Sequence, residues 1–412
     1  MATTKNRFEA QTDARFGDRP FDDRIAWQAR LLSDQLQALR ERLFPPEAKK
    51  TLRRFTSGEV AKLIGVSDGY LRQLSLDHIG PSPDTTPNGR RLYSLEQVNE
   101  LRDYLETARP RETSYFSPRR REGEPLQVLA VANFKGGSAK TTTSLYLAHS
   151  LALKGYRVLA VDLDPQASLT SMFGLQPEFD VGENETLYGA IRYDGLGKPL
   201  SDIVRPTYFS GIALIPANLE LMEFEHETPR AILEKRSKGQ GLFFRRIGAA
   251  LQSVEHDYDV VVIDCPPQLG YLTLGALCAA TGLLITIHPQ MVDVASMSQF
   301  LLMTADLMSV VKDAGAEIRH DFVRYVITRH DPHDGPENQI VALLRGLFEH
   351  DVLAATARKS TAIANAGLTK QTLYELDRSS VGRATYDRAM ESIEAVNDEI
   401  EDLLRQAWGR ST

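Results

Sequence analysis

Apolar residues recur along this chain with spacings that divide it into regions. From Gln127 to about Arg358, short apolar runs such as 158–161 and 260–263 alternate with helical stretches. Strands that alternate with helices form βαβ units and a mostly parallel sheet. The sequence therefore predicts an α/β domain over residues 125–412.

Helical spacing marks both ends of the chain. Residues 1–46 predict a disordered start and then a helix over 21–44, which Pro45 and Pro46 would end. Apolar residues in this helix alternate steps of four and three, as in the a/d seam of a coiled coil. We expect a dimerising helix, although a helix packed on its own subunit would show the same pattern. The seam comprises Ile25, Ala29, Leu32, Leu36, Leu39 and Leu43.

A second amphipathic helix is expected over residues 384–408, where it would cover the α/β domain. Its opposite face is rich in aspartate and glutamate. The apolar face comprises Tyr386, Met390, Ile393, Val396, Ile400 and Leu404.

Residues 55–76 have the spacing of two short helices joined by a turn. Ser57 is expected to cap the first helix, which runs to Ile64, and Ser67 to cap the second, with Gly65 between them. This is the spacing of a helix-turn-helix, although any short helical hairpin shares it. The second helix would present Ser67, Asp68, Tyr70, Arg72 and Gln73 to a major groove.

A hairpin and a third helix follow. Asn88-Gly89 is a turn signal for a β-hairpin, and Ser94 with Gln97 forms a capping box for a helix that ends near Ala108. Residues 47–108 thus resemble the winged helix-turn-helix of MerR-type regulators, and we expect an all-α module with a wing. The resemblance places two arginines on the wing, at phosphate or minor-groove reach: Arg90 and Arg91.

Residues 109–124 join the two halves and contain five arginines among proline and glycine. Proline and charge predict a basic linker. Such a linker could add phosphate contacts beside a DNA-binding module, or serve only as a connector.

Composition narrows the class of protein. The 412 residues predict about two to three domains, and 42% of them are hydrophobic, which suffices for a packed core. No apolar run reaches the roughly 18 residues of a membrane span, and the polar N-terminus lacks a secretory signal. Two cysteines, Cys265 and Cys278, suit a reducing cytoplasm. The net charge of −7 argues against DNA binding by the whole surface, so local basic patches would have to supply it.

Residues 128–144 carry the strongest chemical signal. An apolar strand, a glycine-rich turn and a helix start would aim backbone N–H groups and a helix dipole at a phosphate. Lys140 would reach the β- and γ-phosphates, and the Thr141 hydroxyl would bind Mg²⁺. The strict P-loop pattern fails, because Phe134 and Ala139 stand where it requires glycine.

Two lysines flank the glycines of this loop. The run Lys135-Gly136-Gly137-Ser138-Ala139-Lys140-Thr141-Thr142 resembles the deviant Walker A motif, K-G-G-x-x-K-[ST], of the ParA/MinD group of ATPases. The resemblance implies that all eight residues bind nucleotide. It also implies a nucleotide-sandwich dimer, in which Lys135 reaches the nucleotide of the opposite subunit.

Two further strands end in aspartates at the edge where α/β sheets hold their ligands. The first ends in Asp162-Leu163-Asp164, which resembles the family's switch I, where the second aspartate orients the attacking water. The second ends in Asp264 and matches a Walker B strand. The resemblance thus assigns catalysis to Lys135, Lys140 and Asp164, and Mg²⁺ to Thr141, Asp164 and Asp264. It also places an adenine contact at Thr328 and Arg329.

The combination of motifs resembles the larger plasmid partition ATPases of the ParA family, and within them the RepA type of repABC plasmid cassettes. This implies a cytoplasmic, nucleoid-associated homodimer that uses ATP and Mg²⁺. It would bind DNA non-specifically when ATP-bound, and a centromere-binding protein of ParB/RepB type would stimulate hydrolysis. It would also repress its own operon through the helix-turn-helix. Candidates for non-specific DNA contact are Arg324, Arg345, Arg358 and Lys359.

Three other functions share parts of this pattern. A transcriptional repressor could sense nucleotide with little turnover, but intact Lys140, Asp164 and Asp264 favour an active ATPase. A MinD-like membrane ATPase needs a basic amphipathic tail, whereas the last helix here is acidic. An electron-transfer relative with a bridging iron–sulfur cluster would need a clearer arrangement than Cys265 and Cys278.

Overall fold

The computed structural model describes residues 20–43, 50–109, 116–234, 242–378 and 380–410. The chain divides into two units, 1–49 and 50–412.

In the first unit, α2 (Phe21–Leu43) matches the helix predicted over 21–44. Its three seam residues with described side chains, Ile25, Ala29 and Leu32, are all exposed. The predicted disordered start, the side chains of Leu36, Leu39 and Leu43, and Pro45-Pro46 lie outside what the structure describes. Dimerisation through this seam therefore stays a prediction.

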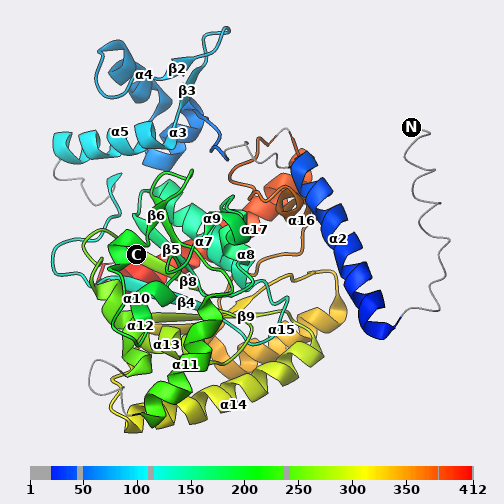
Figure 1. Cartoon of the computed structure of the whole chain (residues 1–412). Coiled ribbons are helices and arrows are strands. Elements are labelled where there is room, and N and C mark those ends of the chain that lie inside the picture. The colour runs from blue at the N-terminus through cyan, green and yellow to red at the C-terminus, as the bar shows by residue number, and fades with distance from the viewer. Residues whose placement is uncertain (1–19, 44–49, 110–115, 235–241, 379, 411–412) are drawn as a thin grey trace, which may run out of the picture. The chain divides into compact units, whose positions relative to one another are not determined.

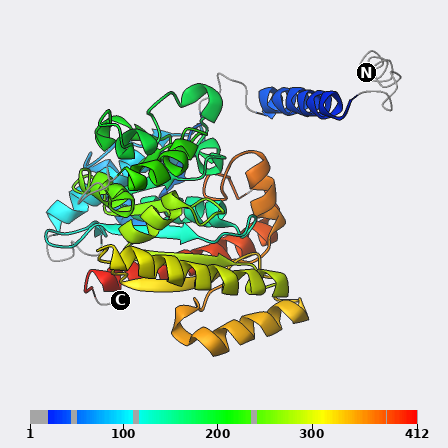
Figure 2. The same cartoon turned by 60° about the horizontal axis from the view of Figure 1, so that its bottom comes forward.

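The second unit contains a seven-stranded sheet with helices on both faces (Figure 1, Figure 2). Its strands are β4 (Gln127–Ala132), β5 (Val158–Asp162), β6 (Arg205–Pro206), β7 (Ile212–Ile215), β8 (Val260–Asp264), β9 (Gly282–Ile287) and β10 (Phe322–Ile327). They lie in the order β10-β9-β4-β8-β5-β7-β6, and only β6 pairs antiparallel. The predicted α/β fold with a mostly parallel sheet is confirmed.

The helices of this domain follow the strands in sequence, as βαβ units require. They are α7 (Lys140–Lys154), α8 (Ser168–Met172), α9 (Pro177–Asp180), α10 (Tyr188–Ile191), α11 (Leu221–Leu233), α12 (Phe243–Gln252), α13 (Tyr271–Ala279), α14 (Met291–Asp313), α15 (Gly335–Phe348), α16 (Thr361–Leu368) and α17 (Arg383–Ala407).

Two hydrophobic cores lie on opposite faces of the sheet. Along β4, Leu129 and Val131 join the core that contains α7 and α17, while Val128 and Ala130 join the core that contains α13 and α14. Both sets of side chains are buried, which explains why these strands are continuous apolar runs rather than alternating ones.

The C-terminal helix α17 covers the sheet as predicted. Its acidic side is partly used in internal contacts, because Lys154 at the end of α7 pairs with Asp398 and Glu401. The six residues predicted for its apolar face are all buried: Tyr386, Met390, Ile393, Val396, Ile400 and Leu404.

Residues 55–108 form a small module before the sheet. It contains β1 (Phe55–Thr56), α3 (Ser57–Ile64), α4 (Asp68–Leu76), β2 (Asp84–Thr85), β3 (Arg91–Tyr93) and α5 (Leu95–Ala108). The expectation of an all-α module is wrong, because the hairpin β2–β3 also pairs with β1.

The helix caps of this module were predicted with one error. Ser67 caps α4, and Ser94 with Gln97 forms the expected capping box of α5. The cap of α3, however, is Thr56 rather than Ser57. Thr56 forms a capping box with Glu59, since the box places its acidic residue three positions after the cap.

A buried arginine joins this module to the α/β domain. The side chain of Arg102, on α5, is only 2% exposed. Its guanidinium donates to the carbonyl of Leu63 at 3.0 Å and to the carbonyl of Leu153 at 2.6 Å. Leu153 lies in the last turn of α7, where helical carbonyls lack partners within the helix. Arg102 therefore caps two helices at once.

The described part of the predicted basic linker, Arg109 and residues 116–124, makes internal contacts. Arg119 pairs with Asp103 at 3.0 Å and donates to the carbonyl of Gly155 at 3.4 Å. The backbone N–H of Arg120 donates to Asp259 at 3.1 Å. These arginines hold the chain against the α/β domain, and Arg111 lies outside the described residues.

Candidate nucleotide-binding site

The glycine-rich loop runs from the end of β4 to the start of α7, as its sequence predicts. Gly137 has φ of +80°, and Ala139, the residue before α7, has φ of +67°. A left-handed conformation costs a non-glycine residue roughly 1–2 kcal/mol. This conformation gives the physical reason why glycine is the more usual residue at position 139.

Lys140 begins α7 and turns back over the loop. It is buried, and its Nζ donates to the carbonyl of Lys135 at 3.3 Å. Burial lowers the pKa of Lys140, while the nearby charges of Asp264, Cys265 and Asp164 oppose that shift. Lys140 is therefore near Asp264 and Asp164, the aspartates that the sequence predicts for Mg²⁺ and for the attacking water.

Asp264 lies at the end of β8 and is fully buried. The Ser144 hydroxyl donates to its Oδ1 at 3.2 Å, and its Oδ2 has no hydrogen-bond partner within the described residues. Burial raises the pKa of Asp264, and the hydroxyls of Thr141 and Ser144 and the charge of Lys140 oppose that shift. An orphaned carboxylate oxygen beside a threonine hydroxyl fits the hydration shell of Mg²⁺, which prefers such hard oxygen donors.

The two aspartates after β5 differ in their surroundings. Asp162 is buried and accepts hydrogen bonds from the backbone N–H of Asp164 at 3.1 Å and from the Thr170 hydroxyl at 2.7 Å. Burial and the charge of Asp264 raise the pKa of Asp162. Asp164 is half-buried, and its Oδ1 accepts from the backbone N–H of Gln166 at 2.9 Å. Asp162 therefore holds the switch I loop, and Asp164 is the more accessible carboxylate.

Thr328 and Arg329 follow β10 and reach the glycine-rich loop. The Thr328 hydroxyl donates to the carbonyl of Ser138 at 3.0 Å, and Arg329 donates to the carbonyl of Gly137 at 3.2 Å. Thr286 on β9 also bonds the Ser138 hydroxyl, at 3.0 Å. The adenine contact stays a prediction, since these bonds show only that the pair supports the loop.

Lys135 has a partner that the sequence did not reveal. Its Nζ forms an ion pair with Asp293, in the first turn of α14. Asp293 lies 158 residues further along the chain, so only the fold brings the two together. An acidic residue in a first helical turn is favoured by the helix dipole alone, which makes it a weak signal.

The candidate DNA-binding side chains are not equally accessible. Arg72 and Arg90 are exposed, whereas Arg91 is half-buried in β3. Ser67 uses its hydroxyl as the cap of α4, and Gln73, although exposed, donates to Asp77 at 2.9 Å.

Tyr70 is half-buried within the module. The guanidinium of Arg109 stacks over its ring, 4.8 Å from the ring centre. The ring of Tyr70 therefore contributes to packing, which sequence spacing could not distinguish from presentation to a groove.

The candidates for non-specific DNA contact in the α/β domain also divide into two pairs. Arg324 pairs with Asp351 at 3.2 Å, and Arg345 donates to the carbonyl of Ala354 at 2.6 Å. Arg358 and Lys359 are exposed just before α16.

One described helix, α14, is long and apolar enough to cross a membrane by length and composition alone. Most of its polar residues are uncharged, and its longest uninterrupted apolar run, residues 300–303, is far shorter than a membrane span. Met297, Phe300 and Val311 of this helix are buried in the domain. This is weak evidence for a membrane span.

Known proteins resemble the chain over most of its length. The family described as an AAA domain matches residues 126–314. A Rhizobium rhizogenes protein named putative replication protein A is 53% identical over 381 residues, which cover 92% of this chain and 94% of that protein. Protein SopA of Escherichia coli (strain K12) is 32% identical over 373 residues, which cover 88% and 92%.

The fold has a counterpart among solved structures. A structure described as a partition protein aligns with 92% of this chain and 98% of its own, with a TM-score of 0.64 and 20% identity. That likeness concerns the fold, whereas the family follows from the relatives above, which span nearly the whole chain. The chain belongs to the ParA family of plasmid partition ATPases.

Proposed function

We propose that this protein is an ATP-dependent plasmid partition protein that works as a homodimer. In the proposed cycle the ATP-bound dimer binds DNA without sequence preference. A centromere-binding protein of ParB/RepB type then stimulates hydrolysis, and the dimer leaves the DNA. The protein would act in the cytoplasm, associated with the nucleoid.

One observation carries the ATPase part of this proposal. The Ser144 hydroxyl of α7 lies 3.0 Å from the Lys140 carbonyl and 3.2 Å from Asp264 Oδ1, and Asp264 pairs in register with Asp162, two residues before Asp164. The two aspartates lie at or just after the carboxyl ends of β5 and β8. The loop after β4 supplies backbone N–H groups, and the start of α7 supplies the positively charged Lys140. This is the edge at which open α/β sheets bind ligands.

The residues of this site have separate roles in the proposed reaction. Lys140 places a positive charge at the β- and γ-phosphates, and the loop N–H groups orient them. Thr141 and Asp264 would hold Mg²⁺, which when bound neutralises charge that builds up on the phosphates. Asp164 would orient the attacking water in line with the bond that breaks. Lys135 would reach the nucleotide of the partner subunit.

DNA binding is proposed at two surfaces with different chemistry. The module of residues 55–108 would read an operator, with Arg72 at the bases and Arg90 at the phosphates. The α/β domain would touch only phosphates, with Arg358 and Lys359 as its exposed candidates. Binding through phosphates alone falls steeply with salt and ignores sequence.

DNA binding with and without ATP tests this proposal. The protein would be titrated against random DNA and against the DNA upstream of its own gene, over a range of salt. We expect ATP to be required for binding random DNA, and upstream DNA to be preferred. Binding to upstream DNA alone, together with negligible ATP turnover, would instead favour a nucleotide-sensing repressor.

A further inference from the structure

The lysine that should reach across the dimer is engaged within its own chain. Lys135 forms its ion pair with Asp293 of the same chain. The Asp293 side chain is 10% exposed and that of Lys135 is 36% exposed. Asp293 is thus held within the domain, whereas the more exposed Lys135 side chain can still move away from Asp293.

Asp293 belongs to a short chain of polar groups. His288 Nδ1 lies 3.3 Å from Asp293 Oδ2, and His288 Nε2 lies 3.5 Å from Glu337 Oε1. Glu337 also accepts from the backbone N–H of Asp331 at 2.7 Å. These contacts connect the ends of β9 and β10 and so hold Asp293 at a defined position.

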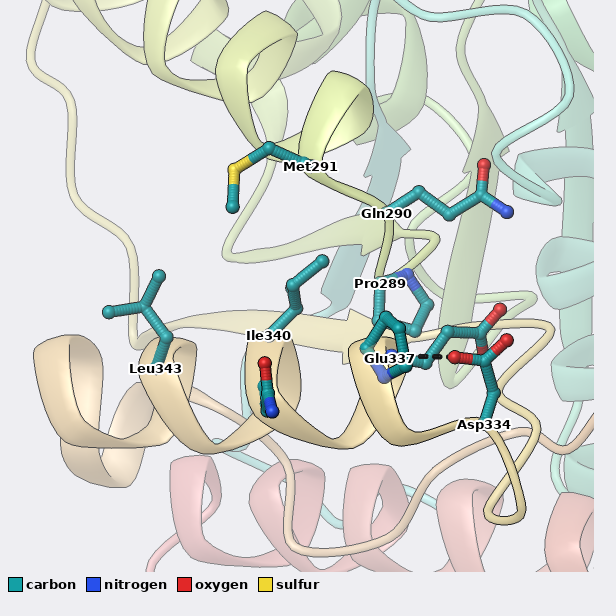
Figure 3. Close-up of a pocket in the computed structure, with 9 residues that line it drawn as sticks. Pro289, Gln290, Met291, Asp334, Glu337, Ile340 and Leu343 are labelled. Atoms are coloured by element: carbon teal, nitrogen blue, oxygen red, sulfur yellow. Dashed lines mark hydrogen bonds between the residues drawn. The ribbon is translucent and has the colours of Figure 1, made fainter.

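Solvent borders this arrangement on one side. A cleft of about 460 Å³ lies between the segment 289–291 and the first turns of α15. Figure 3 shows Glu337 on one wall, with Met291 and Gln290 across from it. Met291 and Val292 are 63% and 69% exposed, so the start of α14 is packed on one side only.

We propose that Asp293 is a brake on assembly: it holds Lys135 within the same subunit and competes with the nucleotide of the partner subunit. This inference rests on the proposed ATP-bound dimer. An ammonium group has three N–H donors but a single positive charge, and a charge that Asp293 neutralises attracts a second anion less strongly. Each Lys135 would therefore loosen its pair with Asp293 when the dimer closes around ATP. Asp293 is a positioning residue in this account, because it acts through Lys135.

Amine acylation tests the ion pair in the nucleotide-free protein. Acetic anhydride would be applied briefly, and acetylation at each lysine would be followed by peptide mass spectrometry, with exposed Lys359 as the internal reference. Asp293→Asn keeps the shape of the side chain but removes its charge. We expect Lys135 to react about two- to fivefold faster in this variant, the range that corresponds to a partly exposed ion pair. Asp306→Asn, at an exposed site on the same helix, should leave the rate unchanged.

Dimer formation tests the brake. A slowly hydrolysed ATP analogue with Mg²⁺ would be titrated, and the dimer fraction measured by sedimentation. Asp293→Asn should lower the protein concentration at half-dimerisation about two- to fivefold. Lys135→Gln should abolish this gain, so that adding Asp293→Asn to Lys135→Gln changes nothing.

The outcomes separate the inference from the function on which it rests. An unchanged Lys135 acylation rate in Asp293→Asn would overturn the ion pair without touching the proposed function. Weaker dimerisation of Asp293→Asn would mean that Asp293 prepares Lys135 rather than restrains it, which also overturns the brake. If neither protein dimerises with the analogue, both the brake and the proposed dimer are wrong, even where acylation confirms the ion pair.

Discussion

The nucleotide site and the helix-turn-helix module were predicted from the same sequence, yet they differ in how their predicted residues are used. At the candidate nucleotide site, the Ser144 hydroxyl contacts both the Lys140 carbonyl and the Asp264 carboxylate, which places the two predicted residues side by side. In the module, Ser67, Tyr70 and Gln73 make contacts inside the module itself. A phosphate-binding loop depends on backbone geometry, which the spacing of residues in the sequence specifies. A surface that reads a DNA groove depends on which side chains packing leaves exposed, and the sequence alone does not show this.

The largest expected effect would come from the nucleotide side of this comparison. Lys140→Ala should reduce ATP turnover at least about 100-fold, because it removes a charge preorganised at the β- and γ-phosphates. Steady-state phosphate release measures this. Lys154→Ala, at the other end of α7, is the matched control and should retain turnover within about twofold, since its partners are Asp398 and Glu401. Equal turnover in Lys140→Ala and the unchanged protein would refute the site.

Removing the contact between the module of residues 55–108 and the α/β domain should have the next largest effect. Arg102→Met keeps the length of the side chain but leaves the carbonyls of Leu63 and Leu153 without their donor. The free energy of unfolding should fall by about 1–3 kcal/mol, the cost of unsatisfied buried polar groups. Urea denaturation measures the loss. An unchanged midpoint would show that the module does not depend on this arginine for its attachment.

A smaller effect sharpens the difference between exposed and packed residues on α4. Arg72→Ala should weaken binding to upstream DNA about tenfold, within the range of one base contact, and leave random DNA within about twofold. Gln73→Ala should cost less, because its amide already bonds Asp77. Competition binding on both DNAs provides the comparison. A larger loss for Gln73→Ala than for Arg72→Ala would reverse the assignment.

The smallest effect concerns the core beneath α7. His149 is fully buried, stacks on Phe209 with ring centres 4.1 Å apart, and bonds Thr372 at 2.9 Å. Burial, assisted by the charge of Lys50, lowers the pKa of His149 well below 6.5. The unfolded chain therefore takes up a proton that the folded chain does not, and stability is lost as pH falls below 6.5.

The size of this effect follows from the linkage. Between about pH 7.5 and 5.5 the contribution of His149 should amount to about 1 kcal/mol. Urea denaturation at the two pH values would be compared with His149→Gln, which cannot titrate and should lose correspondingly less. Identical pH dependence in both proteins would contradict the assignment.

The sequence predicts most of the fold because the signals are local. The apolar runs, the caps at Ser67 and Ser94 and the acids at the ends of β5 and β8 each depend on a few neighbouring residues. Arg102 and Asp293 could not be predicted, because each depends on a partner from a distant part of the chain. A charged residue on a helix is normally expected at the surface, so the burial of Arg102 is visible only once α5 meets α7.

The most direct test of the account follows ATP hydrolysis and release from random DNA on the same sample. The unchanged protein should release DNA as phosphate appears. Asp164→Ala should still bind ATP, with Mg²⁺ held by Thr141 and Asp264, but remain on random DNA, since the positioning of water is lost. Asp264→Ala should not reach the DNA-bound state, because its Mg²⁺ ligand is gone. Release of Asp164→Ala at the rate of the unchanged protein would contradict the claim that hydrolysis at this site controls DNA binding.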